Sequence, residues 1–155
     1  MAMDILEIDN ALLEGLQDQA GAGERLRQNF DLRTSAADGS QRMLNALQPG
    51  TVVPIYRHRE TSETVICLSG RLVEVIYEEV VEYVHEETSR TEEVLRRRQM
   101  REVSRHLLCP ALGRYGIQIP AGVWHTIEVL EPSVIFEAKD GAFAPASEED
   151  VFVGK

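Results

Sequence analysis

The chain has 155 residues, of which 43% are hydrophobic, and its 16 Lys and Arg residues stand against 26 Asp and Glu residues, a net charge of -10. This length fits one domain that buries roughly 70% of the surface of its unfolded chain. A strongly negative chain repels phosphate backbones, so nucleic acid is excluded as an expected partner.

The sequence also argues against a membrane protein. No stretch reaches the ~20 consecutive apolar residues of a membrane-spanning helix, and the first ten residues, MAMDILEIDN, are acidic where a signal peptide carries positive charge. We therefore expect a cytoplasmic protein with no membrane partner. Cys67 and Cys109 lack CxxC spacing, and each lies within an apolar run. In a reducing compartment this pattern predicts two buried free thiols.

The N-terminal region predicts one short amphipathic helix within residues 8–28, starting at Asp9 or Asn10. Its apolar positions recur at helical spacing and are Leu12, Leu13, Leu16 and Ala20. The sequence Gly21-Ala22-Gly23 should end or kink the helix. Residues 29–40 are polar and rich in turn formers, which indicates an extended connector.

From residue 41 onward, short strand-like runs alternate with Gly and Pro residues. The runs are residues 42–47, 51–57, 64–68, 72–83, 115–119, 124–130 and 133–138. Many short strands with regular turn signals predict an all-β sandwich or barrel. We expect a single domain with an N-terminal helix and connector (1–40), a β-barrel (41–139) and a C-terminal cover segment (140–155). Phe143 and Phe152 are the expected anchors of that segment.

Residues 88–107 allow two interpretations. Ser89-x-x-Glu92 resembles a capping box, and several Glu and Arg residues in this stretch stand at helical spacing, which favours a helix. The strand pattern of residues 72–83, however, needs an antiparallel partner after the polar turn at 85–90. We therefore prefer a long hairpin.

Two histidines and one glutamate carry the clearest chemistry. Tyr56 and His58 share one face of a predicted strand, and Glu63 begins the next strand, so that a hairpin would return it beside His58. His125 follows the Pro-x-Gly turn at 120–122. Two imidazoles and one carboxylate with open coordination positions suit iron(II) and its divalent neighbours. The three residues predict a divalent metal site if the fold brings them together.

The spacing of these residues resembles the two motifs of the cupin superfamily, which read Gly, five residues, His-x-His, three or four residues, Glu, six residues, Gly, and Pro-x-Gly-x-x-His. The matching positions are Gly50, His58, Glu63 and Gly70 in the first motif and Pro120, Gly122 and His125 in the second. The chain departs from the pattern at Tyr56, where the first histidine is usual, and at Val129, where Asn is common.

Residues 25–58 and 115–145 further resemble the WbuC family of cupin-fold metalloproteins. This resemblance implies a double-stranded β-helix, or jelly-roll barrel, with a short α-helical N-terminal extension. It also implies a divalent metal at the barrel mouth, with Fe, Mn, Zn and Ni as candidates. Members occur in bacteria, some beside genes for surface polysaccharide synthesis. The resemblance names no reaction, because the family's activity is largely unassigned and the cupin fold hosts many functions.

Tyr56 has three open roles, which are metal ligand, neighbour of a ligand or substrate, and packing residue. A phenol with an ordinary pKa of ~10 binds a metal well only after it loses its proton, so ligation requires the ion to lower that pKa. Tyr56 is also the best candidate for a catalytic base. Further candidates for binding a polar substrate are Arg42, Asn45, Gln118, Trp124, Glu137 and Lys139.

Two classes of function follow from these residues. The first is a metal-dependent enzyme that acts on a small polar, sugar-derived substrate, with an Fe(II)-dependent dioxygenase as one variant. The second is a non-catalytic module that senses a small ligand in the barrel. A Val- and Ile-rich sheet edge commonly pairs with another copy, so we expect a homodimer.

Overall fold

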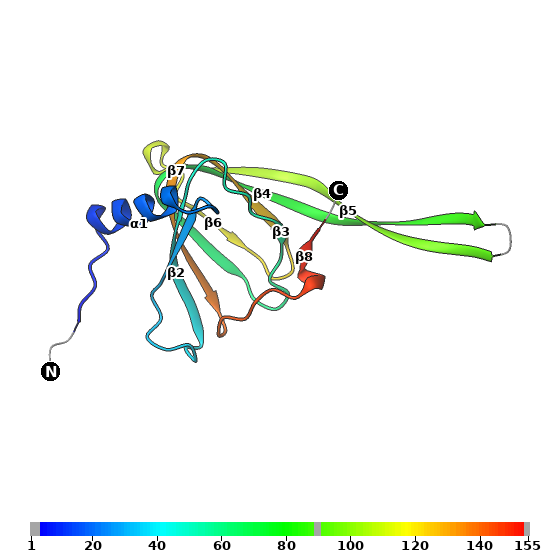
Figure 1. The fold of residues 1–155 in the computed structure, drawn as a ribbon, viewed down its shortest axis with the longest axis horizontal. Coiled ribbons are helices and arrows are strands. Elements are labelled where there is room, and N and C mark those ends of the chain that lie inside the picture. The colour runs from blue at the N-terminus through cyan, green and yellow to red at the C-terminus, as the bar shows by residue number, and fades with distance from the viewer. Residues whose placement is uncertain (1–3, 89–90, 154–155) are drawn as a thin grey trace.

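The computed structural model of the chain describes residues 4–88 and 91–153 (Figure 1). One helix, α1 (Asn10–Ala22), precedes the strands. The strands are β1 (Arg27–Asp31), β2 (Ser40–Leu47), β3 (Ile55–Tyr56), β4 (Glu63–Thr88), β5 (Thr91–Leu108), β6 (Gly116–Ile119), β7 (Trp124–Asp140) and β8 (Val151–Phe152). Two 3₁₀ turns, η1 (Pro110–Leu112) and η2 (Glu148–Asp150), complete the described elements. The strands form one 8-stranded antiparallel sheet over these residues, which confirms the predicted all-β fold.

Strands β4 and β7 bend sharply at the positions where the sequence predicted breaks between strands. The pairing of β4 with β7 shifts register on both sides of Gly70, which has φ +97°. A Cβ at this position would lie 2.3 Å from the carbonyl oxygen of Pro132, so only glycine fits. The chain therefore bends within continuous strands at residues 69–71 and 130–133 instead of ending them.

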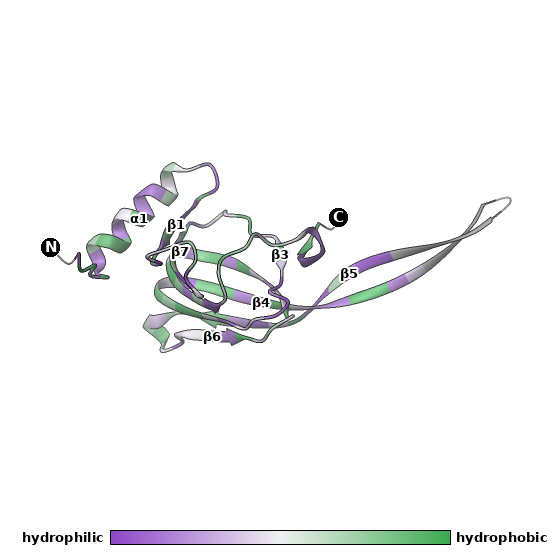
Figure 2. Ribbon diagram, turned by 90° about the horizontal axis from the view of Figure 1, so that it is seen from below, coloured by the Kyte–Doolittle hydropathy of each residue, from purple (hydrophilic) through white to green (hydrophobic). Residues whose placement is uncertain are grey.

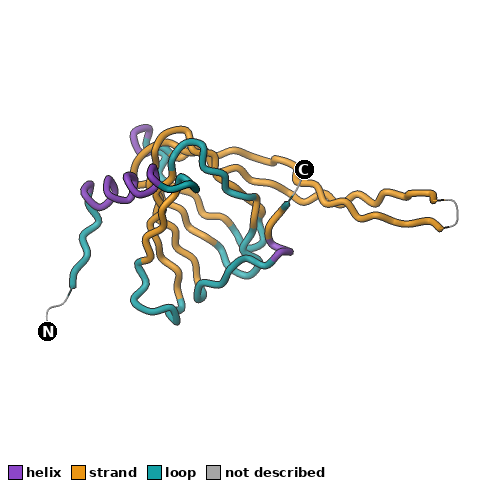
Figure 3. The backbone as a smooth tube through the Cα atoms, in the orientation of Figure 1, coloured by secondary structure: helices purple, strands orange, loops and turns teal. Residues whose placement is uncertain are grey.

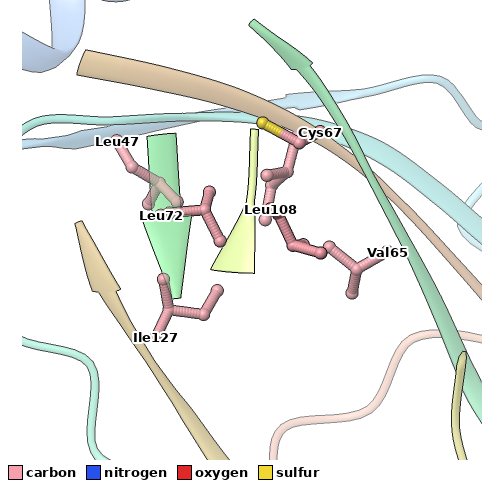
Figure 4. Packing of buried hydrophobic residues seen from close by; sticks show 7 residues of the cluster. Leu47, Val65, Cys67, Leu72, Leu108 and Ile127 are labelled. Atoms are coloured by element: carbon pink, nitrogen blue, oxygen red, sulfur yellow. The ribbon is translucent and has the colours of Figure 1, made fainter. Parts of the chain in front are cut away.

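Because of these bends, the sheet folds over on itself and encloses a core. The buried apolar residues of this core come from both halves of the bent sheet (Figure 4) and are Leu47, Val65, Cys67, Leu72, Leu108, Ile127 and Ile135. Cys67 and Cys109 are free and buried, as predicted. Every second residue of a strand points inward, so the strands alternate between hydrophobic and hydrophilic positions (Figure 2).

Helix α1 covers the outer face of the sheet. Asp9 caps the helix, its side chain accepting a hydrogen bond from the backbone N–H of Leu12, and Gly23 ends it. The predicted apolar stripe packs against the even-numbered residues of β2 and β7. This second cluster contains Leu12, Leu13, Leu16, Ala20, Phe30, Leu32, Leu44, Ala46, Val134 and Phe136. The odd-numbered residues of the same strands consequently face the barrel interior.

Residues 88–107 belong to a hairpin, as preferred, except that residues 89–90 lie outside the described part. Strands β4 and β5 pair from Leu72↔Leu108 to Thr88↔Thr91, and the register shifts at Ile76/Tyr77. Beyond Tyr77 the described part of β4 pairs with β5 alone. The two strands extend away from the barrel as a long arm (Figures 1 and 3).

The helix begins after Asp9 and ends at Gly23, as predicted. Two other local predictions were wrong. The expected connector contains part of a strand, because β1 pairs with β2 from Arg27↔Leu47 to Asp31↔Met43. The predicted strand at 51–57 shrinks to β3, which pairs with β7 and β8. Within residues 4–88 and 91–153, no helix is both long and apolar enough to cross a membrane.

Candidate metal centre

The two histidines and the glutamate meet inside the barrel. His58 follows β3, Glu63 begins β4 and His125 lies near the start of β7. One ligand atom of each residue lies within 4.8 Å of the others. Oε2 of Glu63 is 2.6 Å from Nε2 of His58 and 3.8 Å from Nε2 of His125. Three donors that are far apart in the sequence therefore face one point in space.

The expected hairpin between residues 56 and 63 does not form. Glu63 nevertheless lies beside His58, as predicted. β3 pairs with β7 and β8, whereas β4 pairs with β5, β6 and β7. The backbone of His58 is instead fixed by its carbonyl oxygen, which accepts a hydrogen bond of 2.7 Å from the N–H of Gly122. This bond joins the first sequence motif directly to the Pro-x-Gly turn that precedes His125.

A backbone contact fixes the orientation of the His125 ring. Its Nδ1 lies 3.0 Å from the carbonyl oxygen of Val123, which can only accept, so Nδ1 carries the proton. Nε2 is then left with a free lone pair toward Glu63. Burial, opposed in part by Glu63, lowers the pKa of His125 and favours the neutral ring that binds metals.

Unpartnered atoms show that these residues fit a divalent ion. Oε2 of Glu63 and Nε2 of His125 are buried and have no hydrogen-bond partner. The contact between Glu63 and His58 is close but lacks the alignment of a hydrogen bond. Buried polar atoms are normally paired, so two orphaned acceptors facing one point suit a cation.

Tyr56 lies directly beside the three donors. Its ring centroid is 5.3 Å from that of His58 and 4.5 Å from that of His125. Burial and the nearby carboxylates of Glu63, Glu137 and Glu74 raise the pKa of Tyr56 well above its ordinary value. The phenol therefore keeps its proton unless a bound cation offsets these effects.

A cavity of about 280 Å³ opens beside this cluster and is lined by Tyr56, His58 and Glu63. Three of the six predicted substrate-binding candidates also line it, namely Asn45, Glu137 and Lys139. All three are odd-numbered residues on the interior face of β2 and β7. Burial and the charge of Glu63 raise the pKa of Glu137 to about 8.

The other three candidates do not line the cavity, because each lies on the opposite face of its strand. Arg42 is on the even-numbered face of β2 and contacts Asp38. Gln118 is exposed between Ile117 and Ile119, which point inward. Trp124 is only 3% exposed, but the guanidinium groups of Arg57 and Arg98 cover its ring.

The sequence analysis missed two charged residues of the interior. Arg27 lines the cavity from β1, a strand that was expected to be helix or connector. Glu74 is completely buried and shares the inward face with Leu72, although it was not among the candidate site residues. The period-two pattern of residues 72–76 was the signal that could have placed Glu74 inside.

The family match covers the first of the two sequence motifs. The profile of DUF6016, a domain of unknown function, matches residues 8–90, more than half of the chain. The chain belongs to the DUF6016 family. The matched region contains Tyr56, His58 and Glu63 but ends before His125. No curated protein matches this DUF6016 chain in sequence.

Solved structures identify the fold as that of the cupins. Oxalate oxidase in complex with the substrate analogue glycolate has a TM-score of 0.51 and 12% identity, over 81% of this chain and 56% of that chain. The capsular polysaccharide assembling protein CapF from Staphylococcus aureus has a TM-score of 0.51 and 19% identity, over 84% of this chain and 30% of that chain. This DUF6016 chain thus spans about half the length of the first protein and under a third of the second. At these identities the likeness shows the fold alone, a cupin jelly-roll barrel.

Proposed function

We propose that this DUF6016 protein is a metal-binding cupin in which His58, Glu63 and His125 hold one divalent ion. The observation that supports this proposal most strongly is the pair of buried, unpartnered acceptor atoms on Glu63 and His125. Two imidazoles and a carboxylate leave coordination positions open, which suits Fe, Mn, Zn or Ni. An ion held in this way would supply Lewis acidity to a ligand oxygen.

The proposed ligand is a small polar molecule that enters the cavity beside the three donors. Asn45, Glu137 and Lys139 offer groups that orient it, and the volume of about 280 Å³ favours a compact ligand. A sugar-derived substrate connected with surface polysaccharide synthesis is our preferred assignment. The name of CapF, a capsular polysaccharide assembling protein with the same fold, and the WbuC-like sequence segments support it.

We favour an enzyme over a non-catalytic sensor, because Tyr56 and Glu137 bring groups that carry protons to the same cavity as the proposed ion. Tyr56 would donate a hydrogen bond from its protonated hydroxyl to a ligand oxygen. Two buried free thiols support a reducing, cytoplasmic compartment as part of the proposal.

The decisive experiment is metal analysis of the purified protein and of two matched variants. We expect about one divalent ion per chain in the wild type. His125→Ala should lose the ion while its far-ultraviolet circular dichroism stays that of a β-barrel. His106→Ala, which changes an exposed histidine on β5, should keep it. Full metal retention by His125→Ala would overturn the assignment of the site.

A panel of nucleotide sugars and oxo-acids then separates enzyme from sensor. Turnover of any member by metal-loaded wild type, and not by His125→Ala, supports the enzyme. Binding without turnover of any member would favour the sensor. Oxygen consumption by the iron(II)-loaded protein would instead point to a dioxygenase.

The arm supports a homodimer as the oligomeric state. An isolated two-stranded ribbon is marginally stable in water, and beyond Tyr77 the described part of β4 pairs with β5 alone. Tyr83 on this arm is 66% exposed. We propose that a second copy of the chain covers the arm, since closed twofold pairing is the commonest assembly.

A further inference from the structure

Arg27 projects into the cavity without a partner of its own. It lines the cavity from β1, and its Nε is buried without a hydrogen-bond partner. Among the described residues, no carboxylate lies within 4.0 Å of the Arg27 guanidinium, although seven other arginines form such ion pairs. A partly buried guanidinium is costly to leave unpaired, because burial opposes its charge. An anion in the cavity would satisfy it.

Asn45 supplies a second unpaired group beside Arg27. In the pairing of β1 with β2, Asn29 lies opposite Asn45 and Arg27 lies opposite Leu47, so Arg27 and Asn45 are diagonal neighbours on the interior face. Oδ1 of Asn45 is buried and has no donor. The cavity wall formed by β1 and β2 therefore offers an unpaired cationic donor, Arg27, and next to it an unpaired acceptor, Oδ1 of Asn45.

The same ligand can reach this wall and the metal centre. The guanidinium of Arg27 is close enough to Tyr56 to act on its pKa, and the Tyr56 ring contacts His125. Arg27, Asn45, His58 and Glu63 all line one cavity of about 280 Å³. That volume is just below the range of roughly 300–1,000 Å³ for ligand pockets. The cavity therefore suits one small molecule, which would contact both Arg27 and the three proposed metal ligands.

The charges of the wall select the chemistry of the ligand. Arg25 and Lys139 add positive charge, whereas Glu137 is the acidic residue of this wall. Glu137 attracts Arg27 electrostatically but forms no ion pair with it within 4.0 Å, so the guanidinium has no direct carboxylate partner among the described residues of this wall. The amides of Asn29 and Gln41 can bind hydroxyl groups.

We propose that Arg27 and Asn45 form a subsite that binds the carboxylate and an adjacent hydroxyl of a small hydroxycarboxylate. Arg27 binds the carboxylate through its planar donors, and Oδ1 of Asn45 accepts a hydrogen bond from the hydroxyl. The inference rests on the proposed function in one respect, since the remaining ligand oxygens would face the ion held by His58, Glu63 and His125.

Calorimetric titration with D-gluconate and with D-sorbitol tests the subsite, because the two share a six-carbon polyol chain and differ in the carboxylate. Wild-type protein should bind gluconate at least tenfold more tightly than sorbitol. Arg27→Gln should weaken gluconate binding by roughly 10- to 100-fold, the loss expected for a charge-assisted hydrogen-bonded pair, and leave sorbitol unaffected. Arg114→Gln removes an exposed arginine that does not line the cavity and should change neither affinity.

Asn45→Asp is a second variant of nearly unchanged shape, and it places a negative charge beside Arg27. It should abolish gluconate binding. The subsite is refuted if wild type does not bind gluconate, if sorbitol binds equally well, or if both variants keep the wild-type gluconate affinity. Metal content, measured in the same samples, reports separately on the proposed function. Protein that binds gluconate through Arg27 but retains no metal would support the subsite and overturn the metal site.

Discussion

Tyr56 lies directly opposite His125 in the pairing of β3 with β7, and the two ring centroids are 4.5 Å apart. The residue that stands where the cupin motif usually has its first histidine thus lies beside the three proposed ligands. Burial and the nearby carboxylates raise the pKa of Tyr56, so without a bound ion the phenol keeps its proton.

Two substitutions test this position. Tyr56→Phe should leave the metal content unchanged, because it removes only the hydroxyl group. Tyr56→His should bind the ion about tenfold more tightly, an extra 1.4 kcal/mol or so from one added ligand. Competition with a metal chelator measures both. Loss of metal in Tyr56→Phe would show that the phenol is a ligand after all.

Glu74 predicts an unusual pH dependence of stability in metal-free protein. Both of its side-chain oxygens are buried without partners, and burial together with Glu63 and Glu137 raises its pKa well above 4.5. Below pH 4.5 the carboxyl is protonated in both the folded and unfolded chains. As the pH rises above 4.5, the unfolded chain ionises first, so this group progressively destabilises the folded state.

Glu74→Gln should therefore raise the free energy of unfolding at pH 7.5, by about 1–3 kcal/mol, and change it little at pH 4. Urea denaturation at the two pH values in the presence of a chelator measures the difference. Glu131→Gln, at an exposed position on β7, is the matched control and should have no effect at either pH. Equal effects of Glu74→Gln at both pH values would contradict the explanation.

Gly70 should be among the least replaceable residues of the barrel. Its φ is positive, and the carbonyl oxygen of Pro132 would lie 2.3 Å from an added Cβ, so there is no room for alanine. We expect Gly70→Ala to cost at least about 3 kcal/mol of stability. Gly15→Ala, within α1 and with open space around the new methyl group, should instead stabilise by about 0.5–1 kcal/mol. Thermal unfolding of the two variants gives the comparison.

Trp124 is the one tryptophan of the chain and should report on docking of the C-terminal segment. Arg57 stacks on its ring at 4.6 Å and is held by Asp150 through an ion pair of 2.9 Å. Asp150→Ala should free Arg57 and admit water to Trp124, which shifts the tryptophan fluorescence to longer wavelength. The free energy of unfolding should fall by about 1–3 kcal/mol. Glu148→Ala, an exposed neighbour, should leave the spectrum unchanged.

The arm should be separable from the barrel. Replacing residues 80–99 by Asn-Gly joins β4 to β5 by a two-residue turn, because Glu79 and Met100, which then flank the turn, are already paired. The shortened chain should be monomeric in sedimentation or light scattering and should retain its metal. A dimeric mass of the shortened chain, or a monomeric mass of the wild type, would refute the role of the arm.

The sequence anticipated the elements whose local signals agree. The apolar spacing around Leu16 and the Asp9 cap placed the helix, and the glycine and proline positions placed the bends of β4 and β7. Prediction from the sequence failed where a segment's structure depends on the strand that pairs with it. Arg27 lies in a segment whose local pattern is polar and ambiguous. That segment forms β1 because the edge of β2 is free to pair with it.

Local patterns were enough to specify the fold class and the three donors, because strand alternation and motif spacing can be read from neighbouring residues. Which side chains share the cavity with those donors depended on the folded chain. Bends in β4 and β7 bring together strand segments that are far apart in the sequence, and a shift by one residue moves a side chain to the other face of the sheet. For that reason Arg42 and Trp124 point away from the cavity, whereas Arg27 and Asn45 line it.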